Sequence, residues 1–124
     1  MKTCLVVDDS SVIRKVARRI LEGMQFEISE AEDGAQALEM CRKVLPDAVL
    51  LDLNMPKMDG MTFLRALRRM ELPLAATPVL VISTEAADSD AEGAREAGAN
   101  FYLVKPVVPE TLLAYVALLC GVPG

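Results

Sequence analysis

Carboxylates, hydroxyls and a lysine stand at the ends of apolar runs in this sequence. Asp8 and Asp9 follow the run 3–7, and Asp52 follows the run 48–51. Two later runs are followed by hydroxyls and an ammonium, from Ser83, Thr84 and Lys105. Carboxylates within about 4 Å repel by roughly 4 kcal/mol per pair at an effective dielectric near 20, so a shared site needs protons or a cation. Gathered together, these groups could hold a divalent cation beside a phosphoryl group.

The residue types indicate which metal and which reaction. The chain has no histidine, which excludes Ser-His triads, His-metal sites and phosphohistidine on this chain. Carboxylate and carbonyl oxygens remain, the ligand set that suits Mg²⁺. Lys105 and a hydroxyl on the far side of Asp52 would complete a cradle for a dianionic phosphoryl group. Asp52 would then be the nucleophile that accepts phosphate as an acyl phosphate.

A parallel sheet would bring these side chains to one edge. The run 48–51 is apolar at four successive positions, which is typical of a strand buried on both faces, and Pro56 prevents its continuation. Such strands deliver their last residues to the carboxyl edge of the sheet, where open α/β folds build their sites. The pattern predicts strands over 3–9, 26–31, 48–52, 78–82 and 101–104.

A helix is expected after each strand. The first begins at Ser10 or Ser11 and ends at Gly23; its inward stripe is Val12, Ile13, Val16, Ile20 and Leu21, and its outer face is Arg14, Lys15, Arg18 and Arg19. The second is capped by Asp33 with a reciprocal Gln36, and its inward residues are Ala37, Leu38, Cys41 and Leu45. The third covers 61–70, with Phe63, Leu64 and Leu67 inward and Arg65, Arg68 and Arg69 outward.

The last two helices differ in quality. The segment 86–97 is a poor helix because Asp88, Ser89, Asp90 and Gly93 disfavour its interior, and Gly98 closes it. A final helix runs from Pro109 to about Cys120 and is apolar all round. It is too short to span a bilayer. A surface helix normally has a polar face, so we expect another chain to cover part of this one, as a dimer partner or a docked protein.

Five strand–helix repeats over 124 residues predict one doubly wound α/β domain, 1–124, with right-handed crossovers. The composition is 52% hydrophobic and 25% charged, which argues against disorder. A net charge of -5 argues against a nucleic-acid partner that needs a basic face. No targeting segment is visible. An odd set of cysteines, Cys4, Cys41 and Cys120, predicts reduced thiols in a cytoplasmic protein, used mainly as small apolar side chains.

Four segments together resemble the receiver domain of two-component response regulators. They are VVDDS at 6–10, LLDLNMPKMDG at 50–60, VIS at 81–83 and AGANFYLVKP at 97–106. The resemblance covers the chain from Thr3 to about Cys120 and is strongest to the single-domain chemotaxis type, CheY. It implies a flavodoxin-like sheet of five strands in the order 2-1-3-4-5, covered by five helices.

The resemblance implies a role for each site residue. Asp52 would be phosphorylated by a histidine kinase or a histidine phosphotransfer protein, and Lys105 would grip the phosphoryl group. Asp8 and Asp9, with Asp52 and the backbone carbonyl of Asn54, would hold Mg²⁺. Ser83 matches the hydroxyl that moves toward the phosphate, with Thr84 as its competitor, and Tyr102 matches an aromatic that changes rotamer. Asn54 and Glu85 match positions that tune dephosphorylation, so we expect a short-lived signal. The bond before Pro106 would be cis.

Other interpretations stay open at this point. Each aspartate alone could be a helix cap or a solvated strand end, Lys105 an ordinary surface lysine, and Tyr102 a half-buried strand aromatic. The basic first helix could be a solvated face or could steer an acidic partner. A metal-dependent phosphatase with an aspartyl nucleophile and a non-phosphorylated interaction module are the alternative functions. We expect a phosphoacceptor rather than a turnover enzyme. The chain departs from the family at Val107 and Val108, where a phenylalanine usually follows Lys-Pro.

Overall fold

A five-stranded parallel sheet is the frame of the computed structural model, which describes residues 2–53, 55 and 58–121. The sheet order is β2-β1-β3-β4-β5. The strands are β1 Thr3–Val7, β2 Glu27–Ala31, β3 Ala48–Asp52, β4 Val79–Ser83 and β5 Phe101–Val104. The helices are α1 Ser11–Glu22, α2 Gly34–Lys43, α3 Gly60–Arg68, α4 Asp88–Ala97 and α5 Pro109–Cys120, with a short 3-10 helix, η1, at Leu74–Ala76. The predicted doubly wound α/β fold and its strand order are confirmed.

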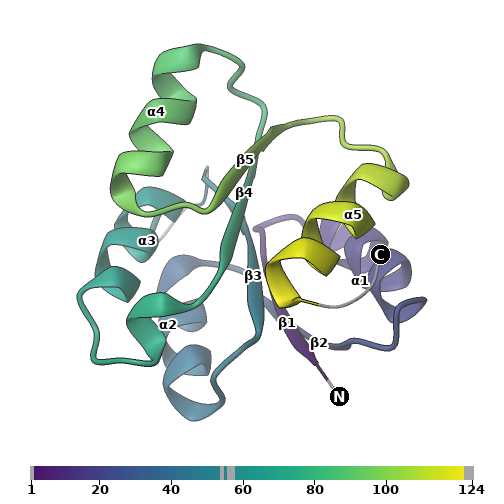
Figure 1. Ribbon diagram of the computed structural model, residues 1–124, viewed down its shortest axis with the longest axis horizontal. Helices are drawn as coiled ribbons and strands as arrows, with labels where there is room; N and C mark the ends of the chain where they lie inside the picture. Colours follow the sequence, from purple (N-terminus) through teal and green to yellow (C-terminus); the bar gives the residue numbers. More distant parts are fainter. Residues whose placement is uncertain (1, 54, 56–57, 122–124) are drawn as a thin grey trace.

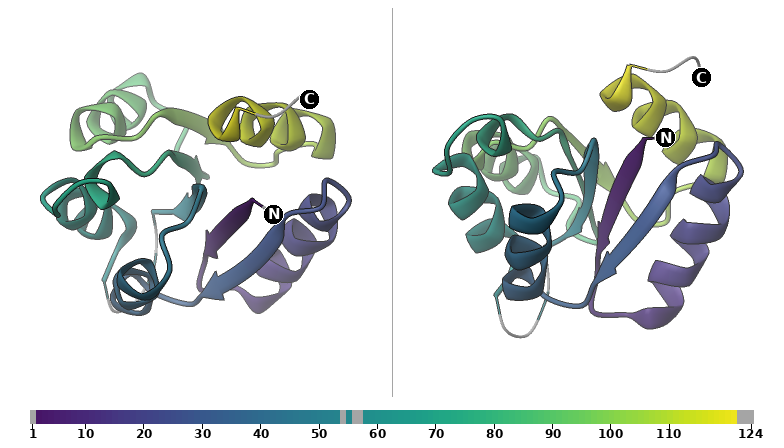
Figure 2. Two further views of the ribbon diagram at one scale, coloured as in Figure 1. Left: turned by 60° about the horizontal axis from the view of Figure 1, so that its bottom comes forward. Right: turned by 90° about the horizontal axis from the view of Figure 1, so that it is seen from below.

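Helices cover both faces of the sheet. Figures 1 and 2 show α1 and α5 on one face and α2, α3 and α4 on the other. Because side chains alternate along a strand, each strand feeds two cores. Cys4, Val6 and Leu50 belong to the core under α1 and α5, and their neighbours Val7 and Leu51 belong to the other. Every residue of β3 is buried, as predicted for a strand covered on both faces.

Several local predictions are confirmed by the backbone and its caps. The Asp33 carboxylate accepts the N–H of Gln36 at 2.8 Å, and the Gln36 side chain in turn accepts the N–H of Glu32 at 2.7 Å. Gly98 ends α4 in the left-handed region, at φ 114°. The Lys105–Pro106 bond is cis, as the resemblance implied. All three cysteines are buried and free, and burial raises the pKa of Cys41 to about 11.

The predicted inward stripe of α1 is correct at its end and wrong at its start. Leu21 is buried and Ile20 packs against the core, as predicted, whereas Val12, Ile13 and Val16 are 67%, 42% and 49% exposed. Ala17, which was not predicted to face inward, is buried. Arg14 and Arg18 share that inward side, spaced one turn apart, and both bind Glu30 of β2. A carboxylate on the neighbouring strand therefore lets two arginines occupy positions where periodicity places apolar side chains.

Two further side chains depart from their predicted sides. Arg68 does not point outward but is partly buried between α3 and α4. Leu45 is not on an inward helix face: α2 ends at Lys43, and Leu45 is 44% exposed in the following loop. The residue before a proline is disfavoured in the helical region, so Pro46 explains why the helix does not reach Leu45.

Candidate functional site

Three aspartates meet at the carboxyl edge of the sheet. Asp8 and Asp9 follow β1, and Asp52 ends the neighbouring strand β3, one residue beyond the register pair Val7–Leu51. A carboxylate oxygen from each of the three lies within 4.8 Å of the others. Asp8 and Asp52 are buried, whereas Asp9 is exposed. The structure thus gathers the acidic residues that the sequence placed at two separate strand ends.

Asp8 is held on every side. Its N–H donates to the Ala31 carbonyl at 3.1 Å. One carboxylate oxygen, Oδ1, accepts the N–H of Ser10 at 2.9 Å, and Oδ2 accepts from the Lys105 ammonium at 3.4 Å. Its carbonyl accepts from Arg14 at 2.6 Å. The position of this carboxylate is therefore fixed by the backbone as well as by side chains.

Lys105 supplies the positive charge of the site. It follows β5, and its Nζ lies 3.4 Å from Asp8 Oδ2 and 3.8 Å from Asp52 Oδ1. A cavity of about 40 Å³ is lined by these three residues together with Ile13 and Ile82. One ammonium offsets part of the repulsion among three carboxylates, which leaves the cluster with a net negative charge at neutral pH.

The donor set fits Mg²⁺. Carboxylate oxygens are hard ligands of the kind that Mg²⁺ prefers, and the three that converge here come from Asp8, Asp9 and Asp52. Exposure of Asp9 leaves one side open to water and to phosphate oxygens, which Mg²⁺ retains as ligands. Asn54, the fourth predicted ligand and a predicted tuning residue, lies outside the described residues.

Ser83 and Tyr102 are connected through one residue. Ser83 is fully buried at the end of β4, next to Ile82, the register partner of Asp52. The Ser83 hydroxyl oxygen accepts the N–H of Glu85 at 3.1 Å, and the Glu85 carbonyl accepts the Tyr102 hydroxyl at 2.7 Å. Thr84, the alternative hydroxyl, is exposed. Two of the predicted switch residues, Ser83 and Tyr102, are thus linked by hydrogen bonds through the backbone of Glu85, and Thr84 is not part of this link.

Two residues near the site were not predicted to serve it. A Cβ at Gly60 would lie 2.5 Å from the Asp52 carbonyl oxygen, so only glycine allows α3 to begin this close to the end of β3. The Asp59-Gly60 pair is the local sequence signal for this position. Arg14 was placed on an outer face, and nothing local in the sequence reveals its contact with the Asp8 carbonyl.

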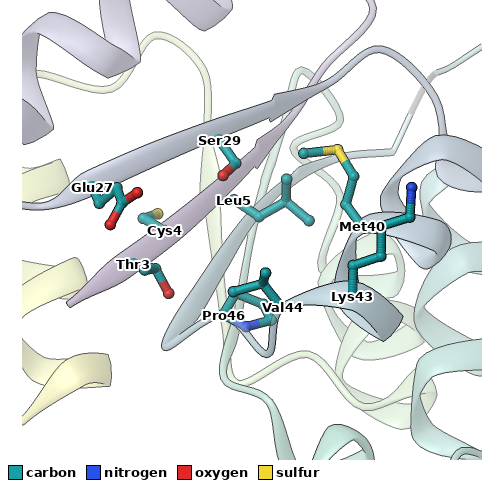
Figure 3. Close-up of a pocket in the computed structure, with 9 residues that line it drawn as sticks. All are labelled: Thr3, Cys4, Leu5, Glu27, Ser29, Met40, Lys43, Val44 and Pro46. Carbon is teal, nitrogen blue, oxygen red and sulfur yellow. The ribbon is translucent and has the colours of Figure 1, made fainter. Parts of the chain in front are cut away.

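A larger hollow lies away from these acids. Figure 3 shows a pocket of about 260 Å³ lined by the first residues of β1, by β2 and by the end of α2: Thr3, Cys4, Leu5, Glu27, Ser29, Met40, Lys43, Val44 and Pro46. It sits at the opposite end of β1 from Asp8 and offers a single carboxylate, from Glu27. The chemistry therefore belongs to the carboxyl edge and not to this pocket.

A comparison with family models decides the family. The model described as the response regulator receiver domain matches residues 4–117. The chain belongs to this family. Among curated relatives, the receiver domain is 44% identical over 115 residues to the transcriptional regulatory protein PrrA of Mycobacterium leprae. That match covers 93% of this chain but 48% of PrrA, so the chain spans about half the length of that relative.

Solved structures agree with the assignment. The receiver domain is 35% identical to the chemotaxis protein CheY4 of Vibrio cholerae, with a TM-score of 0.88, 96% of this chain and 98% of that one covered. The receiver domain of the Francisella response regulator 1452 is 26% identical, with a TM-score of 0.90 and 98% of both chains covered. This chain is therefore a receiver domain of a response regulator, a component of two-component signalling.

The longest helices in the described part of the chain, α1 and α5, have 12 residues each. None of those helices combines the length and the apolar character that a bilayer span requires.

Proposed function

We propose that Asp52 accepts a phosphoryl group from a phosphohistidine on a sensor kinase or a histidine phosphotransfer protein. The observation that carries the proposal is the position of Lys105, whose ammonium lies within 4 Å of both Asp8 and Asp52 while Asp9 completes the acid cluster. A fixed cation beside a buried carboxylate at a sheet edge suits a dianionic phosphoryl group. The interaction-module alternative gives no reason for such clustered repulsion.

The transfer follows from this geometry. A carboxylate oxygen of Asp52 attacks phosphorus, the N–P bond of the donor breaks, and its electron pair returns to the donor imidazole. Lys105 offsets negative charge on the phosphoryl oxygens. Mg²⁺ held by Asp8, Asp9 and Asp52 would supply further neutralising charge for these oxygens. Asp8, held by Ser10 and Lys105, keeps its carboxylate in place during the step.

The acyl phosphate would end by hydrolysis on the same chain. We propose a phosphoacceptor with self-dephosphorylation only, not an enzyme that turns over small substrates. Glu85 and Asn54 are polar and suited to orient a water molecule, so the phosphorylated state would be short-lived. Glu85 is exposed and bonded to both Ser83 and Tyr102 through its backbone, which leaves its side chain outside that chain of hydrogen bonds.

The switch would use the chain Ser83–Glu85–Tyr102. If the Ser83 hydroxyl turns to the phosphoryl group, it no longer accepts the Glu85 N–H, and the Glu85 carbonyl that holds the Tyr102 hydroxyl is released with it. α4 follows directly, has no side-chain cap and buries only Ala94. A weakly anchored helix beside two linked residues suits a population shift between two states.

The output surface would lie on α5 and β5. Val104 is 41% exposed on β5 and Leu118 is 64% exposed on α5. Phe101 and Tyr115 join the two elements in an edge-to-face contact with ring centroids 5.0 Å apart. We propose that this face binds a downstream protein or a second copy of the chain. The prediction that nucleic acid is not a partner stays a prediction, because the relative PrrA is named a transcriptional regulator.

The donor protein would dock on exposed apolar side chains around the acids. Val12, Ile13 and Val16 lie exposed on α1, which begins directly after Asp9, and Ile13 lines the cavity between Asp52 and Lys105. Val108, after Lys105, is 56% exposed. Because Arg14 and Arg18 are paired with Glu30, apolar contact rather than a basic face would provide most of this docking.

Two phosphoryl donors, a phosphohistidine protein and acetyl phosphate, distinguish an effect on donor docking from an effect on phosphoryl transfer. Val12→Asp is expected to slow transfer from a phosphohistidine protein about tenfold or more while leaving transfer from acetyl phosphate within about twofold. Val44→Asp is the matched control, since Val44 is 65% exposed at the other end of the sheet. Equal slowing by both variants, or by Val12→Asp with both donors, would contradict the docking surface.

Intact-mass analysis tests the proposed function itself. With acetyl phosphate and Mg²⁺, the wild type should gain one phosphoryl group, and Asp52→Asn or addition of a chelator should prevent the gain. Wild-type mass that stays unchanged would favour the interaction module. Catalytic release of phosphate from the donor far faster than decay of the phosphorylated protein would favour the phosphatase.

A further inference from the structure

Arg14 joins the acid cluster to the neighbouring strand. Its side chain is 14% exposed and extends from the first turns of α1 toward β2. Nη1 donates to the Asp8 carbonyl at 2.6 Å, and Nε donates to Glu30 Oε1 at 3.0 Å. A guanidinium is planar and carries donors in a fixed fork, so one side chain can hold both acceptors at once. A lysine offers a single ammonium for the same two acceptors.

Glu30 keeps Arg14 in place. It lies on β2 in register with Val6, two residues before Asp8, and its second oxygen accepts from Arg18 Nε at 2.8 Å. Hydrogen bonds from Arg18, and then from Arg14, lower the pKa of Glu30, so it stays ionised at neutral pH. A charged carboxylate with both oxygens occupied leaves Arg14 little freedom to rotate.

The Asp8 carbonyl belongs to the peptide that joins Asp8 to Asp9. The Asp8 N–H and carboxylate are held by Ala31, Ser10 and Lys105, and Arg14 holds the remaining polar group. Asp9 is exposed, and its direction depends on this peptide plane. The hydrogen bond from Arg14 therefore acts on the peptide plane that joins two of the three clustered aspartates.

We propose that Arg14 is a positioning residue for the Mg²⁺ site, with Glu30 as its support. The inference rests on the proposed function only in that Asp8, Asp9 and Asp52 bind the metal. Arg14 would act through its hydrogen bond to the Asp8 carbonyl, orienting the Asp8–Asp9 peptide so that both carboxylates face the same point. Groups that orient metal ligands typically contribute 10-fold to 100-fold in metal affinity.

The loss of Arg14 should change Mg²⁺ affinity in opposite directions, depending on whether Arg14 acts through its charge or by orienting Asp8 and Asp9. Removing a cation near a metal site should strengthen Mg²⁺ binding if charge alone matters. Losing the orientation of Asp8 and Asp9 should weaken it. Arg18 provides the matched control, because it also binds Glu30 but makes no hydrogen bond to Asp8 among the described contacts.

Titration calorimetry of the full chain with MgCl₂ tests the proposal, alongside urea unfolding without metal. Arg14→Met should weaken Mg²⁺ binding about tenfold, Arg14→Lys should fall between it and the wild type, and Arg18→Met should stay within about twofold. Glu30→Gln should weaken binding by less than Arg14→Met. If Arg14→Met is unfolded without metal, the graded effects of Arg14→Lys and Glu30→Gln carry the test.

The outcomes are separable. Unchanged or tighter Mg²⁺ binding by a folded Arg14→Met, or equal weakening by Arg18→Met, would overturn the role of Arg14. No Mg²⁺ binding by the wild type would instead contradict the metal site in the proposed function. Weakening confined to Arg14 and Glu30 variants would support the proposal.

Discussion

Lys105 and Asp8 are 97 residues apart in the chain, and the Lys105 ammonium lies 3.4 Å from the Asp8 carboxylate. The same ammonium lies 3.8 Å from Asp52. Parallel strands make this possible, because β1, β3 and β5 all end at one edge of the sheet. The lysine thus occupies the acid cluster that would also hold Mg²⁺, and it would compete with the metal for the same negative charge.

Lys105→Met should therefore separate metal binding from phosphorylation. Removing one cation a few ångströms from the metal should tighten Mg²⁺ binding roughly fivefold, while loss of charge beside the phosphoryl group should slow phosphorylation by acetyl phosphate about 100-fold. Calorimetry and intact-mass time courses measure the two effects. Lys15→Met, which replaces an exposed lysine, is the control. A fall in both Mg²⁺ affinity and phosphorylation rate for Lys105→Met would argue against competition between the lysine and the metal.

Two glycines should respond to alanine in opposite directions. At Gly60 a Cβ would lie 2.5 Å from the Asp52 carbonyl oxygen, so Gly60→Ala should reduce the free energy of unfolding by about 2–3 kcal/mol and slow phosphorylation. At Gly93, within α4, a Cβ would meet no atom within 4 Å, so Gly93→Ala should stabilise by about 0.5–1 kcal/mol. Urea unfolding measures both. Destabilisation by Gly93→Ala would contradict the open space that the structure places beside Gly93.

Arg68 should stabilise the fold, unlike a solvent-exposed surface arginine. Its guanidinium donates to the carbonyls of Ala75, Thr77 and Gly98 and to the Asn100 side chain, and burial lowers its pKa. Arg68→Met leaves these acceptors without the donor and should cost about 2–4 kcal/mol in the free energy of unfolding. Arg69→Met, at an exposed position, should change it by less than about 0.5 kcal/mol. Similar effects for the two variants would contradict the structural role.

Acid should destabilise the fold partly through Glu30. Its pKa is lowered in the folded state, so its contribution is present above the ordinary glutamate pKa of about 4.3 and is lost as pH falls through the lower folded value. Glu30→Gln should be less stable than the wild type at pH 7, and the difference should shrink below about pH 4. Unfolding measured from pH 3 to 7 checks this, with the exposed Glu39→Gln as control. A difference that is constant with pH would indicate packing instead.

Long apolar runs made the frame predictable. The run 48–51 and the residues that follow each strand led to the sheet, its burial and the gathering of Asp8, Asp9 and Asp52 at one edge. Caps at Asp33 and Gly98 were predictable for the same reason, because their chemistry is local. These features depend on a few neighbouring residues, which the sequence displays directly.

Features that depend on a distant partner were not predictable. Arg14 and Arg18 face Glu30 on β2, and Arg68 faces three carbonyls, at η1 and at the end of α4, so periodicity alone assigned all three arginines to solvent. The same error placed Val12 and Val16 inside, although they are exposed beside the site. Only the fold reveals that Ser83 and Tyr102 share Glu85.

Borohydride reduction tests the central claim most directly, because it converts a phosphorylated aspartate into homoserine at the modified position. The protein is treated with acetyl phosphate and Mg²⁺, reduced, digested and analysed by peptide mass spectrometry. Homoserine is expected at position 52 and at no other aspartate, and none is expected without Mg²⁺. Homoserine at Asp8, Asp9 or Asp59, or its absence from every peptide of a folded, Mg²⁺-loaded protein, would contradict the central claim.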